Sequence, residues 1–246
     1  MELKEKNKHP RDEHISFKEE GHEYNIDGDI GYTSVTSFLK QFFQEFDADK
    51  AIDNIRRSSK YRYSKYYGMD KRTIKAMWDN RREVAAKNGT MCHKDIENAY
   101  NYGNLEVCYP EFDQFLEFNY DHIKWAIYRT EWLIYNTKYR LAGSVDAIFQ
   151  HTDTGKFIMC DHKTSDDIVV SGYNKAKSPI SHLDDCNFWK YALQQNLYKW
   201  MLEEEYGILI DEMYITWFCK KNTSYKKIKV PLLSKEIIDI LNSKEV

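Results

Sequence analysis

Two short segments of the sequence carry carboxylates and an amine at a spacing that could perform chemistry. The segments 143–146 and 161–164 are each predicted to end a β-strand, and each delivers an aspartate. Because side chains alternate along a strand, Asp161 and Lys163 project from the same face. Two carboxylates can hold a divalent metal ion, and a lysine beside them can position a water against a phosphate. The pattern predicts metal-dependent hydrolysis of a phosphodiester.

Each segment alone also has a plainer explanation. Asp146 could cap a turn, and Asp161 with Lys163 could form an ion pair at a solvated strand end. The combination favours a metal site because residues 157–160 form an apolar run, which is typical of a buried strand. Charges at the end of a buried strand are costly unless they are paired or bind metal. Oxygen ligands favour Mg²⁺ or Mn²⁺, and strand geometry adds the carbonyl of His162 as a further ligand.

The elements that must position these residues follow an α/β pattern. Residues 1–12 are charged and poor in apolar side chains, so we expect a flexible tail. Residues 13–125 are predicted to be mainly helical, and 126–246 to form the sheet core with the metal site. We therefore expect one domain over 13–246, with a mixed central sheet flanked by helices and a helical N-terminal elaboration.

Capping residues set the expected ends of several helices. Ser34 is predicted to cap one helix, Asp47 or Asp49 the next and Ser234 the last. Gly207 is expected to end a helix that begins at about residue 183. The other expected elements are a hairpin over 14–26, helices over 70–100 and 111–125, strands over 126–135, 139–149 and 156–162, and a hairpin of 213–219 with 226–230.

The composition narrows the class of protein. A net charge of −3 excludes a uniformly basic surface, although a localised basic groove remains compatible with it. The five cysteines form no CxxC pair, which argues against a zinc ribbon or a disulfide framework and suits a reducing compartment. No apolar stretch approaches the ~20 residues of a membrane span, and no signal peptide is recognisable. We expect a soluble intracellular protein of the cytoplasm or nucleus, without membrane contact; a viral or phage origin stays open.

Residues 56–67 interleave basic and aromatic side chains. Cations that contact phosphates and rings that stack on bases are the usual means of binding single strands. A solvated amphipathic linker explains the same composition equally well. The candidate nucleic-acid-binding residues are Arg56, Arg57, Lys60, Arg62, Lys65 and Tyr66.

Four further residues have both a structural and a functional interpretation. A lone histidine such as His93 is more often a surface or core residue than a ligand. Glu131 lies on the first predicted strand of the sheet and is either an ordinary strand acid or a support for the metal site. Gln194 and Tyr198 share one helix face, where they are either a partly buried stripe or part of the site.

Five of these residues follow one another in a known order: Asp146, Asp161, Lys163, Gln194 and Tyr198. This order resembles the PD-(D/E)xK nuclease superfamily, and the Gln-x-x-x-Tyr motif resembles that of its RecB-like exonuclease branch. Residues 89–97 resemble the helical motif of that branch, which includes lambda-type and mitochondrial genome maintenance exonucleases. The resemblance covers about residues 85–220 and implies a restriction-endonuclease-like core.

The resemblance also implies roles for individual residues. His93 would join the metal ligands, Glu131 would support the metal site, and Gln194 and Tyr198 would contact the phosphate backbone and the active-site lysine. The iron–sulfur members of this branch carry a close cysteine cluster after the Gln-x-x-x-Tyr helix, but only Cys219 follows it here. We therefore expect Mg²⁺ or Mn²⁺ as the cofactor and no iron–sulfur cluster.

Together these features predict a metal-dependent DNA exonuclease that acts on single-stranded DNA or on duplex ends. A structure-specific DNA or RNA endonuclease on the same core is one alternative. A nucleic-acid-binding module with a decayed site is another, although the intact carboxylates and lysine argue against it. Cleavage polarity, the preference between DNA and RNA, the oligomeric state and the biological pathway stay open at this point.

Overall fold

The structure is a computed structural model that describes residues 2–103 and 105–244. The chain divides into two compact units, one formed by residues up to Gln44 and from Cys92 onward, the other by Glu45–Met91. This differs from the single domain expected over 13–246. Among the described residues of Glu45–Met91, the buried hydrophobic side chains are Ile52 and Ile74. Neither residue belongs to the hydrophobic clusters of the larger unit.

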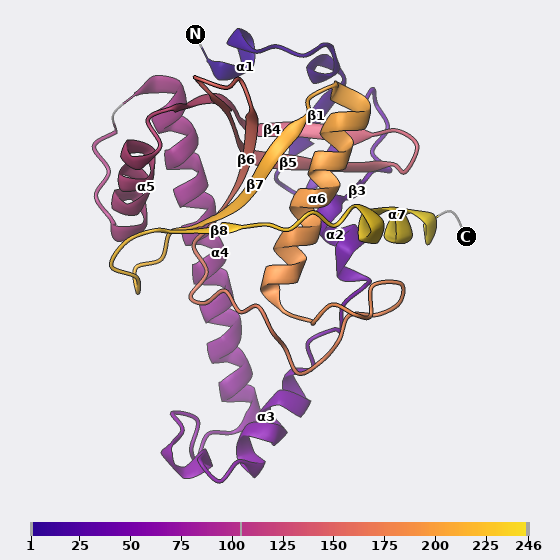
Figure 1. The fold of residues 1–246 in the computed structure, drawn as a ribbon. Coiled ribbons are helices and arrows are strands. Elements are labelled where there is room, and N and C mark those ends of the chain that lie inside the picture. The colour runs from indigo at the N-terminus through magenta and orange to yellow at the C-terminus, as the bar shows by residue number, and fades with distance from the viewer. Residues whose placement is uncertain (1, 104, 245–246) are drawn as a thin grey trace. The chain divides into compact units, whose positions relative to one another are not determined.

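The larger unit is built on a mixed sheet (Figure 1). Its strands are β3 (Thr33–Ser34), β4 (Trp125–Asn136), β5 (Leu141–His151), β6 (Phe157–Lys163), β7 (Ile210–Trp217) and β8 (Lys226–Lys229). Strand β5 pairs antiparallel with β4 and β6, and its first residues pair in parallel with β3. Strands β6 and β7 are parallel, whereas β7 and β8 are antiparallel. The predicted α/β class with a mixed central sheet flanked by helices is confirmed.

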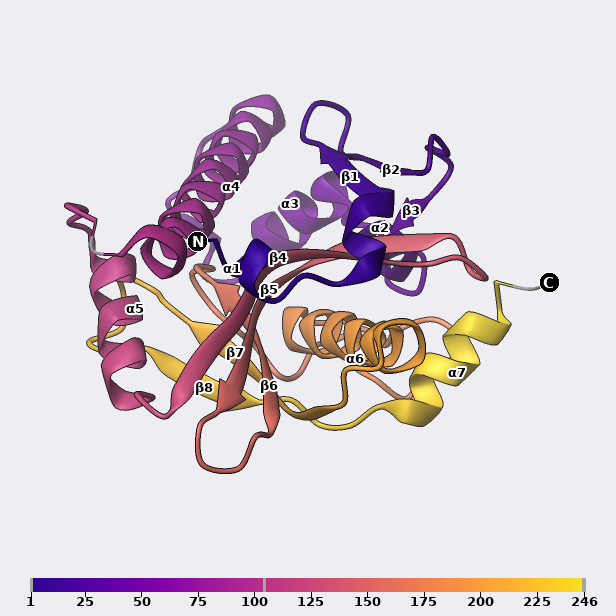
Figure 2. The ribbon, with the colours of Figure 1, turned by 90° about the horizontal axis from the view of Figure 1, so that it is seen from above.

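Two large hydrophobic clusters cover the sheet, and a smaller third one packs residues of β1 (Ile15–Lys18) and β2 (Glu23–Ile26) against β4 and β5. The first large cluster packs α2 (Val35–Lys40), α6 (Asn187–Tyr206) and α7 (Ser234–Asn242) against the strands. The second packs α5 (Pro110–Asp121) and the last turns of α4 (Lys71–Tyr102) against β5 and β6. Figure 2 shows α6 and α7 together on one side of β4 and β5. Because consecutive strand residues face opposite sides, the end of β6 presents side chains to both layers.

The first residues of the chain do not form the expected flexible tail. Residues 2–12 contain α1 (Leu3–Lys6) and lead into the 3-10 helix η1 (Pro10–His14). Leu3 is buried, and the carboxylate of Asp12 forms a buried ion pair of 2.7 Å with Arg129 of β4. These long-range contacts hold a segment that its composition alone would leave loose.

Most predicted element ends are confirmed. The Ser34 hydroxyl accepts the N–H of the third helix residue, Asp47 does the same for the next helix, and Gly207 ends α6 in the left-handed region at φ +64°. The cap at Ser234 is wrong, because Leu233 holds the capping position and makes no side-chain bond there. The remaining elements are α3 (Ala48–Arg57) and the 3-10 helix η2 (Tyr61–Tyr63). Among the described residues, no helix combines the length and apolarity that crossing a membrane requires.

Candidate metal centre

The predicted site residues lie where β5 and β6 stop pairing. The ladder between these strands runs from Gln150 and Phe157 to Ala147 and Cys160, while β6 continues beside β7 as far as Lys163. The residues that come next on the two strands, Asp146 and Asp161, therefore lack partners across the ladder. One carboxylate oxygen of Asp146 accepts the backbone N–H of His162 at 2.7 Å instead. A side chain thus replaces a ladder bond and is held in a fixed position between the two strands.

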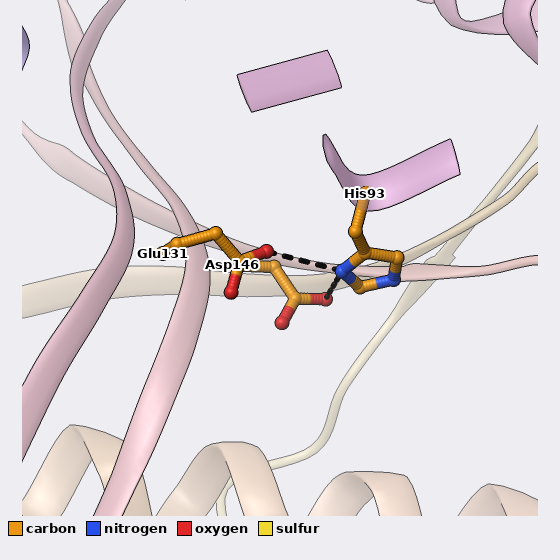
Figure 3. A group of neighbouring side chains, drawn as sticks. All are labelled: His93, Glu131 and Asp146. Carbon is orange, nitrogen blue, oxygen red and sulfur yellow. Dashed lines mark hydrogen bonds and ion pairs between the residues drawn. The ribbon is translucent and has the colours of Figure 1, made fainter. Parts of the chain in front are cut away.

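Three side chains from three elements converge beside this point (Figure 3). His93 comes from α4, Glu131 from β4 and Asp146 from β5, and one ligand atom of each lies within 4.8 Å of the others. The Nδ1 atom of His93 is 3.1 Å from Oε1 of Glu131 and 3.7 Å from Oδ2 of Asp146. All three side chains are partly buried. The arrangement is a compact set of two carboxylates and one imidazole.

The backbone carbonyl of His162 also faces this set, as strand geometry predicted. It lies 3.0 Å from Nε2 of His93, the ring nitrogen that does not face Glu131. The His162 ring points elsewhere: it is buried, bonds through Nδ1 to the Thr216 hydroxyl and packs on Phe218. His162 therefore offers the site its carbonyl oxygen and not its imidazole.

Glu131 lies in a strained stretch of β4. Its φ of +41° is in the left-handed region, which a residue with a side chain rarely adopts. The residues on either side of it, Thr130 and Trp132, pair with Ala147 and Val145, so Glu131 faces the same stretch of β5 as Asp146. Such strain costs on the order of 1–3 kcal/mol and is typical of functional sites.

The second carboxylate oxygen of Glu131 is also engaged, because the hydroxyl of Ser144 donates to it at 2.9 Å. Glu131 is thus fixed between His93 on one side and Ser144 on the other. Ser144 was absent from the predicted site. The signal was available, since Ser144 and Asp146 are expected to share one face of the same strand.

Asp161 and Lys163 form a second part of the site. The Lys163 ammonium lies 2.6 Å from Oδ2 of Asp161, and both side chains are largely buried, at 18% and 5% exposed. Asp161 is therefore adjacent to the three-residue set but is not one of its members. The ammonium also lies 4.9 Å from the ring centroid of Tyr191 on α6, a contact that was not predicted.

Burial and charge shift the pKa values of the site in opposite directions. Burial lowers the pKa of the His93 ring, but the charge of Asp146 and the bond to Glu131 outweigh it and raise the value to about 9. Burial raises the pKa of both aspartates, against the opposing charges of His93 and Lys163 for Asp146 and of Lys163 for Asp161. For Lys163, the two aspartates outweigh burial and hold the pKa above its ordinary value. The centre therefore places two cations among three carboxylates.

Gln194 and Tyr198 lie side by side on α6, as the i, i+4 spacing predicted. The Gln194 amide donates to the Tyr198 hydroxyl at 3.3 Å. The Tyr198 ring is buried directly against Gly143 of β5, where a Cβ atom would come within 2.5 Å of Cε1. In the described part of the chain, no hydrogen bond joins either residue to Lys163, and Tyr191 makes the contact from α6 instead.

The predicted nucleic-acid-binding residues lie in the smaller unit. Arg56 is tied down by a bond from its guanidinium to the carbonyl of Met69 at 2.8 Å. The Tyr66 hydroxyl accepts the indole N–H of Trp78, and the Lys65 ammonium lies 5.1 Å from the Tyr66 ring centroid. Arg57, Lys60, Arg62 and Lys65 are exposed, whereas Arg56 and Tyr66 are half-buried.

Comparisons with known proteins add little to this geometry. No family model matches the chain, and no curated protein matches it. Among solved structures, the crystal structure of SSO0001 is similar to this chain, with 14% sequence identity and a TM-score of 0.35. The likeness covers 87% of this chain and 74% of that one. At this level the likeness carries no statement about activity.

Proposed function

We propose that this protein is a Mg²⁺- or Mn²⁺-dependent nuclease with a restriction-endonuclease-like core, acting as an exonuclease on single-stranded DNA or duplex ends. One observation carries the proposal. His93, Glu131 and Asp146 converge beside the Asp161–Lys163 pair at the point where two central strands separate. Two parts of the chain that resemble motifs of PD-(D/E)xK nucleases, about 70 residues apart in sequence, thus lie together in space.

The residues present fit a hard divalent cation. The donors are carboxylates, a backbone carbonyl and one imidazole, with no thiolate among them, a set that suits Mg²⁺ or Mn²⁺. The Oδ2 atom of Asp161 is buried, and the Lys163 ammonium lies 2.6 Å from it. A carboxylate oxygen can accept more than one bond, so Asp161 keeps capacity to accept a ligand bond as well. Asp146, Asp161, His93 and the His162 carbonyl would hold the ion, with Glu131 beside them.

When bound, such an ion lowers the pKa of a coordinated water and offsets negative charge on the phosphate. The chain's own residues supply the positioning. The raised pKa of Lys163 keeps its ammonium protonated at neutral pH, so it can donate to the attacking water and to the phosphate oxygens. Asp161 fixes the lysine, and Ser144 fixes Glu131. His93 must lose its proton before it can act as a ligand, so metal binding releases protons.

A cleavage assay with matched variants tests the proposal. End-labelled linear and circular single-stranded DNA, with RNA in parallel, are incubated with Mg²⁺ or Mn²⁺. Asp161→Ala and Lys163→Ala are each expected to slow cleavage by about 100-fold or more, because charge stabilisation of this kind is typically worth that much. Lys199→Ala is the control, because Lys199 has the same 18% side-chain exposure and an ion pair with Glu203. Full cleavage by the Asp161 or Lys163 variants would refute the assignment.

The same assay distinguishes the alternatives. Degradation of linear DNA with circles spared supports an exonuclease, whereas cut circles identify an endonuclease on the same core. Cleavage of RNA in preference to DNA changes the substrate class. Binding without cleavage under every metal condition identifies a nucleic-acid-binding module with a decayed site.

A further inference from the structure

The smaller unit has a charge opposite to that of the rest of the chain. Residues Glu45–Met91 contain 12 Lys and Arg against seven Asp and Glu, a net charge of +5. The rest of the chain, with 24 against 32, carries −8, so the overall value of −3 conceals the difference. A compact unit of this charge attracts polyanions, while the larger unit repels them except at a metal.

Several cations of this unit are free to meet a ligand. Some of its basic side chains are used internally, as in the ion pairs of Lys71 with Asp53 and of Lys75 with Asp49. Others form no ion pair within the described residues, and among them are Arg57, Lys60, Arg62 and Lys65.

The same unit also carries an open aromatic cleft. Phe46 is 71% exposed, and its ring centroid lies 5.7 Å from that of Trp78 on α4. These two rings, with Ala48 and Arg82, line a cavity of about 510 Å³. The Trp78 indole is held in place, because its N–H donates to the Tyr66 hydroxyl at 2.8 Å. One ring is therefore fixed, and the other leaves most of its surface to solvent.

Phe46 leaves most of an aromatic ring open to solvent beside a fixed indole. Both rings offer an apolar surface, and the surrounding unit offers positive charge. Single-stranded nucleic acid matches this combination, because its bases stack on aromatic rings while its phosphates meet lysine and arginine. A volume of this size lies within the range of small-ligand pockets and can accept a nucleobase.

We infer that the Phe46–Trp78 cleft is a base-stacking subsite for single-stranded DNA. The two ring centroids are 5.7 Å apart, so a base stacks on the solvent-exposed face of Phe46 beside Trp78 rather than between the rings, and the cations of the same unit that lack ion pairs contact the phosphates. The inference deepens the proposed function by naming where the strand is gripped, and it rests on that proposal for the choice of DNA. It differs from the cation-and-tyrosine segment 56–67 in assigning base contacts to residues outside that segment.

Binding of the full chain is measured by fluorescence anisotropy in EDTA, so that no cleavage occurs. The probes are a labelled oligothymidylate and an abasic sugar–phosphate strand of the same length. Phe46→Ala should weaken oligothymidylate binding by roughly 5- to 150-fold, the range expected for one stacked base, and leave abasic-strand binding unchanged. Lys60→Ala should weaken binding of both probes, because it removes a phosphate contact.

Two conservative variants separate the aromatic ring of Phe46 from its apolar bulk. Phe46→Trp should bind oligothymidylate like wild type, whereas Phe46→Leu, which keeps apolar bulk but loses the ring, should bind like Phe46→Ala. Tyr120→Ala is the control, because this tyrosine of the larger unit is 78% exposed. Wild-type affinity in Phe46→Ala, or an equal loss on both probes, would overturn the inference. EDTA excludes cleavage, so a loss of binding by Phe46→Ala on oligothymidylate alone supports the subsite even if Asp161 and Lys163 prove to have no role in cleavage. If the wild-type protein binds neither strand, the subsite is refuted whatever the nuclease assay shows.

Discussion

Gly143 is the position where one added methyl group would disturb the site most directly. In Gly143→Ala the new Cβ would lie 2.5 Å from Cε1, 2.6 Å from the hydroxyl oxygen and 2.9 Å from Cζ of Tyr198. Tyr198 is buried and cannot swing into solvent. The backbone of Gly143 is not in the left-handed region, so alanine meets no conformational penalty there. Any destabilisation therefore comes from overpacking against one ring.

The expected size follows from two opposing effects. Overpacking a filled core costs about 1–3 kcal/mol in the free energy of unfolding. Replacing glycine within a strand by alanine returns about 0.5–1 kcal/mol. The net loss expected for Gly143→Ala is therefore about 1–2 kcal/mol. In a chain of this size such a loss lowers Tm by roughly 2–8 °C.

The partner variants make this prediction specific. In a Tyr198→Ala background the obstructing ring is gone, so Gly143→Ala should become stabilising by about 0.5–1 kcal/mol. In a Tyr198→Phe background two of the three close contacts remain, so the same substitution should stay destabilising. The expected coupling energy between Gly143 and Tyr198 is about 1.5–3 kcal/mol, the upper part of the range for residues in contact.

Urea unfolding followed by circular dichroism measures each free energy, and the slope against urea checks that the unfolded state is unchanged. A Gly143→Ala protein as stable as wild type would refute the packing argument. So would an equal loss in the wild-type and Tyr198→Ala backgrounds, because the effect would then have nothing to do with the ring.

Two further predictions concern charges of the larger unit. Mn²⁺ should raise the Tm of the wild-type protein by mass action, and His93→Ala should weaken the Mn²⁺ affinity by at least about tenfold. His182→Ala, which breaks a histidine–glutamate pair elsewhere, should leave the Mn²⁺ affinity unchanged. Equal Mn²⁺ titrations of all three proteins would remove His93 from the ligand set. Although burial raises the pKa of Asp12, hydrogen bonds from Arg129 and its neighbours outweigh it and hold the value below the ordinary one. The stabilisation of the fold by the ionised Asp12 carboxylate is present above about pH 4 and is lost as pH falls through the lowered pKa. Asp12→Asn should therefore lower the free energy of unfolding by about 3–5 kcal/mol at pH 7 and by progressively less below pH 4. A cost that does not change with pH in urea unfolding would contradict this.

The strand ends that carry the site could be predicted from the sequence because local patterns determine them. An apolar run marked β6 as buried, and the alternation of strand side chains put Asp161 and Lys163 on one face. Gly207 marked the end of α6 by a backbone requirement that few other residues meet. These inferences use only neighbours in the sequence, and tertiary contacts did not override them.

The parts that could not be predicted depend on partners far apart in the chain. Asp12 and Arg129 are 117 residues apart, and the pair between them is what turns a charged N-terminus into a packed one. The division at Glu45–Met91 depends on which apolar residues find a common core, which periodicity along one helix does not reveal. Tyr191 contacts Lys163 because α6 crosses the sheet at a particular place, and no spacing in the sequence encodes that crossing.

The local rules of folding are broken together, and at one place. Glu131 has a φ that disfavours any side chain, a ladder bond between β5 and β6 is replaced by the Asp146 carboxylate, and the charged Asp161–Lys163 pair is largely buried. The backbone strain and the buried charges both carry a cost in stability, and packing alone offers no reason for them to coincide. A divalent cation would balance the surplus carboxylate, while the strained backbone keeps Glu131 aimed at the same point. The coincidence of these costs in three strands is therefore the strongest structural argument that this centre was selected for chemistry rather than for the fold.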